Sequence, residues 1–222
     1  MKILAIILLT SSLGAILSAQ TPVNQSAGAT TDVGLRVAFL NKSALSQLKA
    51  AQSDIDTFQS KFIGVNQIDI LLDLAELANK GIALWWLPEV DVTQSFIEAY
   101  KEYQTTGKVP TAKTPIPKAR AAVLDIQALY DSKTGIKQLA RRLKEAAQKF
   151  PNQRTSPSEK EGFDNYLKEA RDALFKALDG FAKESGYTLV INASVRLPED
   201  LTSVPKSDMT RAFIDKYNRL HP

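Results

Sequence analysis

The chain has 222 residues, of which 44% are hydrophobic and 23% are charged, and its formal net charge is +4. This composition is ordinary for a soluble globular protein, and the length allows one or two domains. Cysteine is absent, which excludes disulfides, thiolate nucleophiles and cysteine-type zinc sites. The one histidine, His221, would have to supply any histidine-based catalytic triad from a position where we expect the chain to fray.

Residues 1–19 have the pattern of a cleaved signal peptide. Met1 and Lys2 form a minimal basic start, residues 3–17 are largely apolar, and small residues precede Gln20. An uncleaved membrane anchor is the alternative, but the apolar run is short for a span and contains polar residues. The sequence therefore predicts export across the inner membrane to the periplasm, with a flexible linker at 20–34.

Residues 35–106 are predicted to form a first unit of strands and helices. A strand at 35–40 precedes a helix whose apolar residues recur three and four apart, from Leu45 to Phe62, on a seam that suits another helix. The remaining predicted elements of this unit are a second helix at 68–79, a strand at 82–87 and a closing helix at 91–103.

The strand at 82–87 contains two adjacent tryptophans, Trp85 and Trp86. Neighbouring residues of a strand point to opposite faces, so the two indoles cannot share one side. We expect one to pack in the core of the first unit and the other at an interface with the second unit or another chain. An aromatic platform for a ligand is the alternative, but packing is much commoner.

A linker at 107–118, marked by a glycine and three prolines, leads to a second unit at 119–222. Residues 119–129 alone could also form a helix, but their match to 36–45 predicts that this unit begins with a strand at 121–125. A strand at 187–192, which we align with the strand at 82–87, and a helix opened by Asp208 are predicted to complete it.

The middle of the second unit is predicted to be a helical arm over about 133–185. A basic helix at 133–150 and a returning helix at 157–185 would be antiparallel, with Ser156 and Glu159 forming a capping box at the second start. At 1.5 Å per residue the two helices would span roughly 27 and 43 Å. The surplus turns of the returning helix must therefore pack on the strands or on the first unit.

The two units match each other at both ends. The ten residues from Arg36 are similar to the ten from Arg120, and the closing helices that follow Asp91 and Asp208 both read Asp-x-Thr-x-x-Phe-Ile-acid-x-Tyr. Two matched ends in the same order indicate a tandem duplication.

Charge is distributed unevenly along the chain. Residues 69–98 contain six acids and one lysine, a net of −5, whereas residues 101–149 contain eleven Lys or Arg and four acids, a net of +7. The basic stretch is a candidate for attracting acidic partners or an anionic membrane surface. The alternative is a set of solvated helix faces without a binding role.

The ordered set of strand, paired helical arms, strand and closing helix resembles the Skp/OmpH family of periplasmic chaperones. The best-matching segments are 122–139, with Val123-Leu124-Asp125-Ile126-Gln127, and 183–217, with Asp208-Met209-Thr210. The resemblance implies an α+β, mostly α fold: a small β-body for oligomerisation with projecting antiparallel helical arms, here in two tandem OmpH-like repeats. It also implies a homo-oligomer, a trimer in the family, whose arms enclose unfolded outer-membrane proteins. This chain differs in its duplication, its short and broken arms and its acidic 69–98 stretch.

The function that this reading predicts is an ATP-independent holdase without cofactor or metal. Its client-binding residues would be the basic residues of the second arm: Lys133, Lys137, Arg141, Arg142, Lys144 and Lys149. The alternative is a non-catalytic structural or scaffold protein of the cell envelope, in which the strand at 82–87 docks a partner.

Catalysis and nucleic-acid binding are less well supported by the sequence. Asp91 and Asp208 could be a carboxylate pair, but each lies where a helix cap is expected, and no phosphate loop, metal cluster or triad motif occurs. Export would remove nucleic acid as a partner, and the basic run lacks interleaved aromatic residues.

Overall fold

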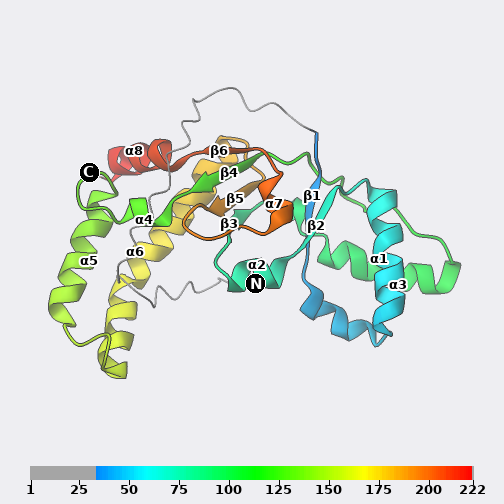
Figure 1. Ribbon diagram of the computed structural model, residues 1–222, viewed down its shortest axis with the longest axis horizontal. Helices are drawn as coiled ribbons and strands as arrows, with labels where there is room; N and C mark the ends of the chain where they lie inside the picture. The colour runs from blue at the N-terminus through cyan, green and yellow to red at the C-terminus, as the bar shows by residue number, and fades with distance from the viewer. Residues whose placement is uncertain (1–33, 222) are drawn as a thin grey trace.

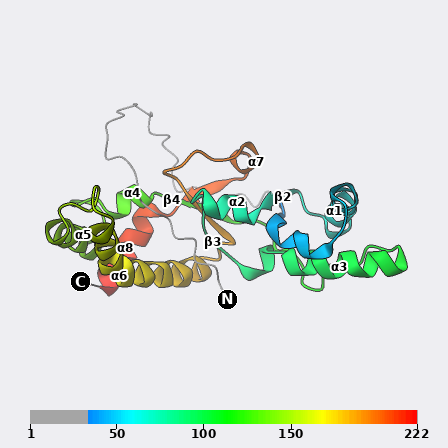
Figure 2. The same ribbon diagram turned by 90° about the horizontal axis from the view of Figure 1, so that it is seen from below.

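The computed structural model describes residues 34–221, so the predicted signal peptide and nearly all of the linker at 20–34 lie outside the described residues. The fold is α+β and mostly α, as the sequence predicts, with two small sheets in the middle of an elongated molecule (Figures 1 and 2). Helices of the first unit lie at one end and a helical hairpin of the second unit lies at the other (Figure 1). Within residues 34–221, no helix combines the length and apolar character that a membrane span requires.

The first unit is built around a parallel pair of strands, β1 and β2, in which Val37 lies opposite Ile70. Its helices enclose a core rich in aromatic rings, where the ring centroid of Phe58 lies 5.1 Å from that of Phe96 and 5.2 Å from that of Tyr100. The elements in chain order are β1 (Val37–Leu40), η1 (Lys42–Leu48), α1 (Gln52–Asn66), β2 (Ile70–Asp73), α2 (Leu74–Asn79), β3 (Ala83–Trp86), η2 (Pro88–Val90) and α3 (Thr93–Thr106).

Two helix predictions for the first unit are wrong. The predicted helix at 68–79 is the strand β2 followed by α2, whose start is capped because the Asp73 carboxylate accepts the amide protons of Ala75 and Glu76. The predicted continuous seam from Leu45 is divided between η1 and α1, since Lys49 adopts a left-handed conformation with φ of 50°. Short apolar strands and helices share the same local pattern, and only pairing with β1 makes β2 a strand.

The second unit contributes three strands to a four-stranded sheet of order β3-β5-β4-β6. The strand β4 is parallel to β5 and β6, whereas β3, which belongs to the first unit, is antiparallel to β5. The elements are β4 (Ala121–Leu124), α4 (Ile126–Leu129), α5 (Lys137–Lys149), α6 (Pro157–Glu184), β5 (Leu189–Asn192), α7 (Glu199–Thr202), β6 (Lys206–Asp208) and α8 (Thr210–Leu220).

In the first unit, the end of β1 is tied to the start of α3. The amide of Val92 donates to the carbonyl of Phe39 at 2.9 Å, and the amide of Asn41 donates to the hydroxyl of Thr93 at 2.8 Å. The carboxylate of Asp91 accepts the amide proton of Thr93 at 3.1 Å. These bonds fix the turn through which the closing helix begins.

The second unit repeats these bonds between β4 and α8. The amide of Met209 donates to the carbonyl of Val123 at 3.0 Å, and the amide of Asp125 donates to the hydroxyl of Thr210 at 2.9 Å. The carboxylate of Asp208 accepts the amide proton of Thr210 at 2.8 Å. The two sequence-matched helix starts therefore have matching hydrogen bonds.

The strand that occupies the position of β5 in the first unit is β2, so the predicted alignment of 82–87 with 187–192 is wrong. Just before β2, the amide of Asp69 donates to the backbone carbonyl of Arg36 at 2.9 Å. Just before β5, the amide of Thr188 donates to the backbone carbonyl of Arg120 at 2.9 Å. Each of these strands is parallel to the first strand of its unit, β2 to β1 and β5 to β4, whereas β3 is antiparallel to β5. A glycine after a helix precedes both β3 and β5, and this local likeness misled the alignment.

The strand β3 joins the two units, and its two tryptophans point to opposite faces as expected. The indole Nε1–H of Trp85 donates to the carboxylate of Asp179 in α6 at 2.8 Å. The ring of Trp86 packs edge-on against Phe39 of β1, with centroids 6.2 Å apart. A shared core that includes Phe39, Ala83 and Ile191 completes the junction.

Candidate functional site

The predicted client-binding residues lie on a hairpin of α5 and α6 that projects at one end of the molecule (Figure 1). The helix α5 begins at Lys137 instead of at 133, because Asp131 organises a turn before it. One carboxylate oxygen of Asp131 accepts the amide protons of Lys133 at 2.9 Å and Thr134 at 2.7 Å. This acceptance lowers the pKa of Asp131, with the bonds from Thr134 as the largest cause.

The two helices of the hairpin are unequal. The helix α5 has 13 residues and is about 20 Å long, whereas α6 has 28 residues and is about 42 Å long. The first half of α6 pairs with α5, and the second half packs Leu174, Leu178 and Ala182 into the core beside the sheet and α8. The surplus turns of α6 thus pack on the strand body, which is one of the two surfaces that the sequence predicts.

The tip of the hairpin is held by specific contacts. The carboxylate of Glu159 accepts the backbone amide proton of Asn152 at 2.7 Å, and the hydroxyl of Ser156 accepts the amide proton of Glu159 at 3.4 Å. A Cβ atom on Gly162 would lie 2.5 Å from the ring of Phe150, so the glycine lets this ring lie against α6. These contacts define the turn between the helices.

The base of the hairpin is bonded to the closing helix α8. The side-chain oxygen of Asn218 accepts the amide proton of Lys137 at 3.1 Å, and its nitrogen donates to the carbonyl of Gly135 at 3.1 Å. A guanidinium nitrogen of Arg211 donates to the carbonyl of Thr134 at 3.4 Å. Because both tip and base are bonded, the hairpin presents the side chains of α5 on a fixed frame.

Four of the six predicted residues are exposed on α5 or in the turn before it, and we define these as the basic face: Lys133, Lys137, Arg141 and Lys144. The last three are four and three residues apart on α5, a spacing that places them on one side of a helix, and Lys133 is in the turn before it. All four are exposed.

The other two predicted residues lie apart from the basic face. The half-buried Arg142 faces α6, where its guanidinium lies 3.8 Å from the carboxylate of Glu169. The amine of Lys149 lies over the ring of Tyr166, 5.3 Å from its centroid, at the tip. Both residues therefore contribute to the cohesion of the hairpin.

The charge of the basic face is only weakly offset within the hairpin. Five basic residues and one acid, Glu145, lie on α5. Glu145 is 3.8 Å from Arg141 in an exposed pair, which contributes little, and it also accepts a hydrogen bond from the hydroxyl of Tyr166. That bond raises the pKa of Tyr166. Among the described residues, Lys137 and Lys144 form no ion pair.

The basic stretch at 101–149 does not form one surface. Lys101 belongs to α3, at the opposite end of the molecule from α5 (Figure 1). Lys113 pairs with Glu98 at 2.9 Å. Some acids of 69–98 also interact within the first unit, since the carboxylates of Asp69 and Asp73 accept backbone amide protons. The clustering of charge along the sequence therefore overstates its clustering in space.

Exposed apolar surface is scarce on the described part of the chain. Among residues 34–221 the exposed large hydrophobic residues are Val65 and Leu220, and neither belongs to α5 or α6. The apolar residues of the hairpin, such as Leu139 and Leu167, are buried between the helices or against the sheet. A ligand of this hairpin would meet charged and polar groups first.

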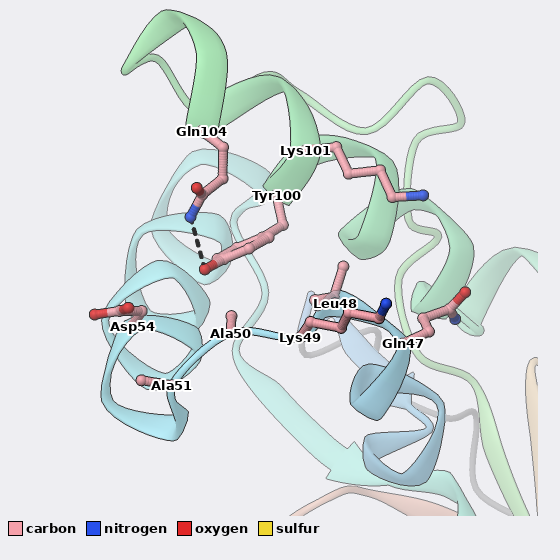
Figure 3. A pocket seen from close by; sticks show the side chains of 9 residues that line it. All are labelled: Gln47, Leu48, Lys49, Ala50, Ala51, Asp54, Tyr100, Lys101 and Gln104. Carbon is pink, nitrogen blue, oxygen red and sulfur yellow. Dashed lines mark hydrogen bonds between the residues drawn. The ribbon is translucent and has the colours of Figure 1, made fainter.

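A surface hollow of about 440 Å³ lies at the other end of the molecule, where η1, α1 and α3 meet (Figure 3). Lys49, Asp54 and Lys101 give it mixed charge, and a hydrogen bond of 2.8 Å from Gln104 to Tyr100 lies along one wall (Figure 3). The sequence contains no signal for this hollow, because its walls come from three elements that meet only in the folded chain.

Asp91 and Asp208, the two carboxylates considered for catalysis, each accept a backbone amide proton at the start of a helix. This is the role expected of an aspartate at such a position. Within the described part of the chain, no three His, Asp or Glu side chains are grouped so that they could hold a metal ion. Comparisons with protein-family models, with curated proteins and with solved structures find no significant match to this chain.

Proposed function

We propose that this chain is an exported, non-catalytic holdase that binds unfolded outer-membrane proteins on the basic face of α5. The observation that carries the proposal is the set of exposed charges of Lys137, Arg141 and Lys144 along one side of α5, with the exposed Lys133 in the turn before it. The bonds at the tip and base of the hairpin support it, since they hold this face away from the rest of the molecule. Release would need no ATP, because each contact is weak.

The chemistry of this face makes the proposed binding electrostatic. An exposed lysine or arginine gains little from a single carboxylate in water, but several such contacts made by one flexible chain act together. Since large apolar groups are not exposed on α5 or α6, salt should weaken the complex strongly. The favoured clients are unfolded segments with several acidic residues.

We also infer a tandem duplication of a unit related to the Skp/OmpH family. The matching bonds of Thr93 and Thr210, and the parallel pairing of β2 and β5 with the central strands, support the duplication. The family relationship rests on the sequence resemblance, which favours a homo-oligomer in the periplasm. The duplicated unit could replace one subunit of the family trimer, and light scattering on the mature protein tests this.

The test of the holdase proposal is suppression of aggregation of a chemically unfolded outer-membrane barrel diluted into low salt. Wild-type protein should suppress aggregation, and a variant with Lys133, Lys137, Arg141 and Lys144 all changed to Gln should lose most of the effect. A matched control changes Lys42, Lys49, Lys101 and Lys108 to Gln, which removes the same charge from the first unit and the start of the linker. Equal loss in both variants, or no suppression by wild type at several-fold excess, would contradict the proposal.

A scaffold protein of the cell envelope is the second candidate, and the fixed hairpin favours it. The sequence hypothesis has the segment 82–87 dock a partner, but the side chains of this segment are buried or half-buried in the cores of the chain itself. The docking surface would therefore be the hairpin itself. Recovery of a stable, stoichiometric complex with an envelope protein, together with no suppression of aggregation, would favour the scaffold over the holdase.

A further inference from the structure

The strands β2 and β5 have the same parallel pairing with the central strand of their unit but differ on their other side. The outer side of β5 is covered by β3, and all four residues of β5 are buried. The strand β2 is at the edge of its two-stranded sheet, and of its residues only Leu72 is buried. Within residues 34–221, the corresponding edge of β2 therefore lacks a strand such as the one that covers β5.

The backbone groups that bind β3 on β5 are known from the hydrogen bonds. The carbonyl of Thr188 accepts the amide proton of Leu87 at 3.0 Å, and the amide of Asn192 donates to the carbonyl of Ile82 at 2.8 Å. Between them Val190 lies opposite Trp85. Pairing therefore uses the carbonyl of Thr188, whose amide donates to the carbonyl of Arg120, and the alternate residues Val190 and Asn192 of β5.

The corresponding groups on β2 point away from β1. The amide of Ile70 donates to the backbone carbonyl of Arg36 at 3.2 Å. In a parallel ladder the next residue, Leu71, therefore directs its amide and carbonyl away from β1. The amide of Asp73 shares this direction by alternation, and an outward carbonyl of Asp69 is inferred from its likeness to Thr188, since the amides of both donate to the carbonyl of an arginine, Arg36 or Arg120. Within residues 34–221, none of these four groups has a hydrogen-bond partner.

We propose that the outer edge of β2 binds an extended polypeptide segment of another protein as an added antiparallel strand. We infer the antiparallel orientation of the added segment from the pairing of β3 with β5. In that pairing Trp85 lies opposite Val190, so the added segment should place an apolar residue opposite Leu71. Asp69 and Asp73 flank Leu71 on the same face of the strand, so basic residues on either side of that centre complement the edge. This site is separate from the basic face and does not rest on the holdase proposal.

A second copy of the chain is a poor occupant of this edge. Antiparallel pairing of β2 with itself about Leu71 would place Asp69 of each copy opposite Asp73 of the other. Like charges directly opposite each other destabilise a pair of strands. The edge therefore favours a segment from a different protein, with lysine or arginine at these positions.

The test uses a fluorescent peptide with the sequence of residues 81–88 in which lysine replaces Ile82 and Leu87. Binding to the full chain is followed by fluorescence anisotropy at low salt. The substitution Leu71→Pro removes the outward amide without removing a bond to β1, and it should weaken binding at least tenfold. A thermal unfolding midpoint close to that of wild type shows that the variant is folded.

A second pair of measurements keeps the proposal testable if that proline perturbs the fold. Joint substitution of Asp69→Asn and Asp73→Asn keeps side-chain acceptors for the nearby amides. It should lower the affinity for the lysine peptide several-fold and leave the affinity for the unsubstituted peptide unchanged. Amide exchange at Leu71 and Asp73 should slow when the lysine peptide binds. Slowing at Val190 instead would mean displacement of β3 and would overturn the proposal. Unchanged affinity in both variants, or a dimer of the chain that Leu71→Pro dissociates, would also overturn it.

Discussion

In the first unit the chain leaves β1 through η1 and the 15-residue α1 and returns to β2, whereas in the second it leaves β4 and returns to β5 through a hairpin whose second helix alone has 28 residues. The frame around the central strand nevertheless has the same bonds in both units, through Thr93 and Thr210. The difference teaches that the length of the helices between the two parallel strands does not affect the bonds between the first strand and the closing helix. These bonds form at the end of the first strand, before the chain enters the inserted helices.

The cores of the two units also differ. The first unit packs Phe58 against Phe62, Phe96, Tyr100 and Tyr103, while the corresponding part of the second unit packs leucines of α6 beside Phe213. The aromatic core suits one short helix with little surface to bury, whereas the long α6 buries many smaller side chains. The following predictions test how far the two units are equivalent.

The largest expected effect comes from truncating the phenylalanine that the closing helices share. Phe96 and Phe213 are 0% and 1% exposed, so Phe96→Ala and Phe213→Ala should each lower the free energy of unfolding by about 3–5 kcal/mol. Denaturant unfolding followed by tryptophan fluorescence and by helical circular dichroism measures both. Because β3 joins the units, the two signals should change together, and separate transitions would show that the units unfold independently.

The next largest effect concerns the threonine hydroxyls. Replacing Thr93 or Thr210 with Val leaves the amide of Asn41 or Asp125 without its acceptor, which should cost about 1–3 kcal/mol. The loss should be larger for Thr210, which is buried, than for the half-buried Thr93. Serine at either position keeps the hydroxyl and is the control. An effect at one position only would break the proposed equivalence.

A smaller effect is expected where α1 and α6 end. Gln67 and Gly186 follow these helices with φ of 53° and 70°, a left-handed conformation that disfavours a side chain. Gln67→Gly should therefore stabilise the chain by up to about 1 kcal/mol, and Gly186→Ala should destabilise it by about 1–2 kcal/mol. Thermal unfolding of each variant checks the opposite signs, and the same sign for both would contradict the comparison.

The smallest expected effect is a dependence on alkaline pH that belongs to the second unit. Burial raises the pKa of Tyr130 above its ordinary value of 10.0, although Arg171 lowers it in part. The folded state therefore favours the neutral phenol, and this stabilisation is complete below about pH 10 and is lost as the pH rises through the folded pKa. Tyr130→Phe should therefore reduce the loss of stability between about pH 9 and 11. Denaturant midpoints across this range, compared with wild type, measure it.

The sequence predicts the helical spacing of the basic face but not which basic residues lie apart from it. The spacing of Lys137, Arg141 and Lys144 already indicates one face of a helix, because helical period is a local property. The inward direction of Arg142 and the position of Lys149 over Tyr166 depend on where α6 lies, and no pattern within α5 contains that information.

The sequence by itself determined the elements that local chemistry encodes: the strands β1 and β5, the closing helices after Asp91 and Asp208, and the hairpin turn before Glu159. It determined β4 through the match of 120–129 to 36–45, since the local pattern of this strand also suits a helix. Only the tertiary structure decided that 70–73 is a strand and that β3 belongs to the sheet of the other unit. The physical reason is that caps and turns are satisfied by residues a few positions away, whereas a strand is defined by hydrogen bonds to a partner far along the chain.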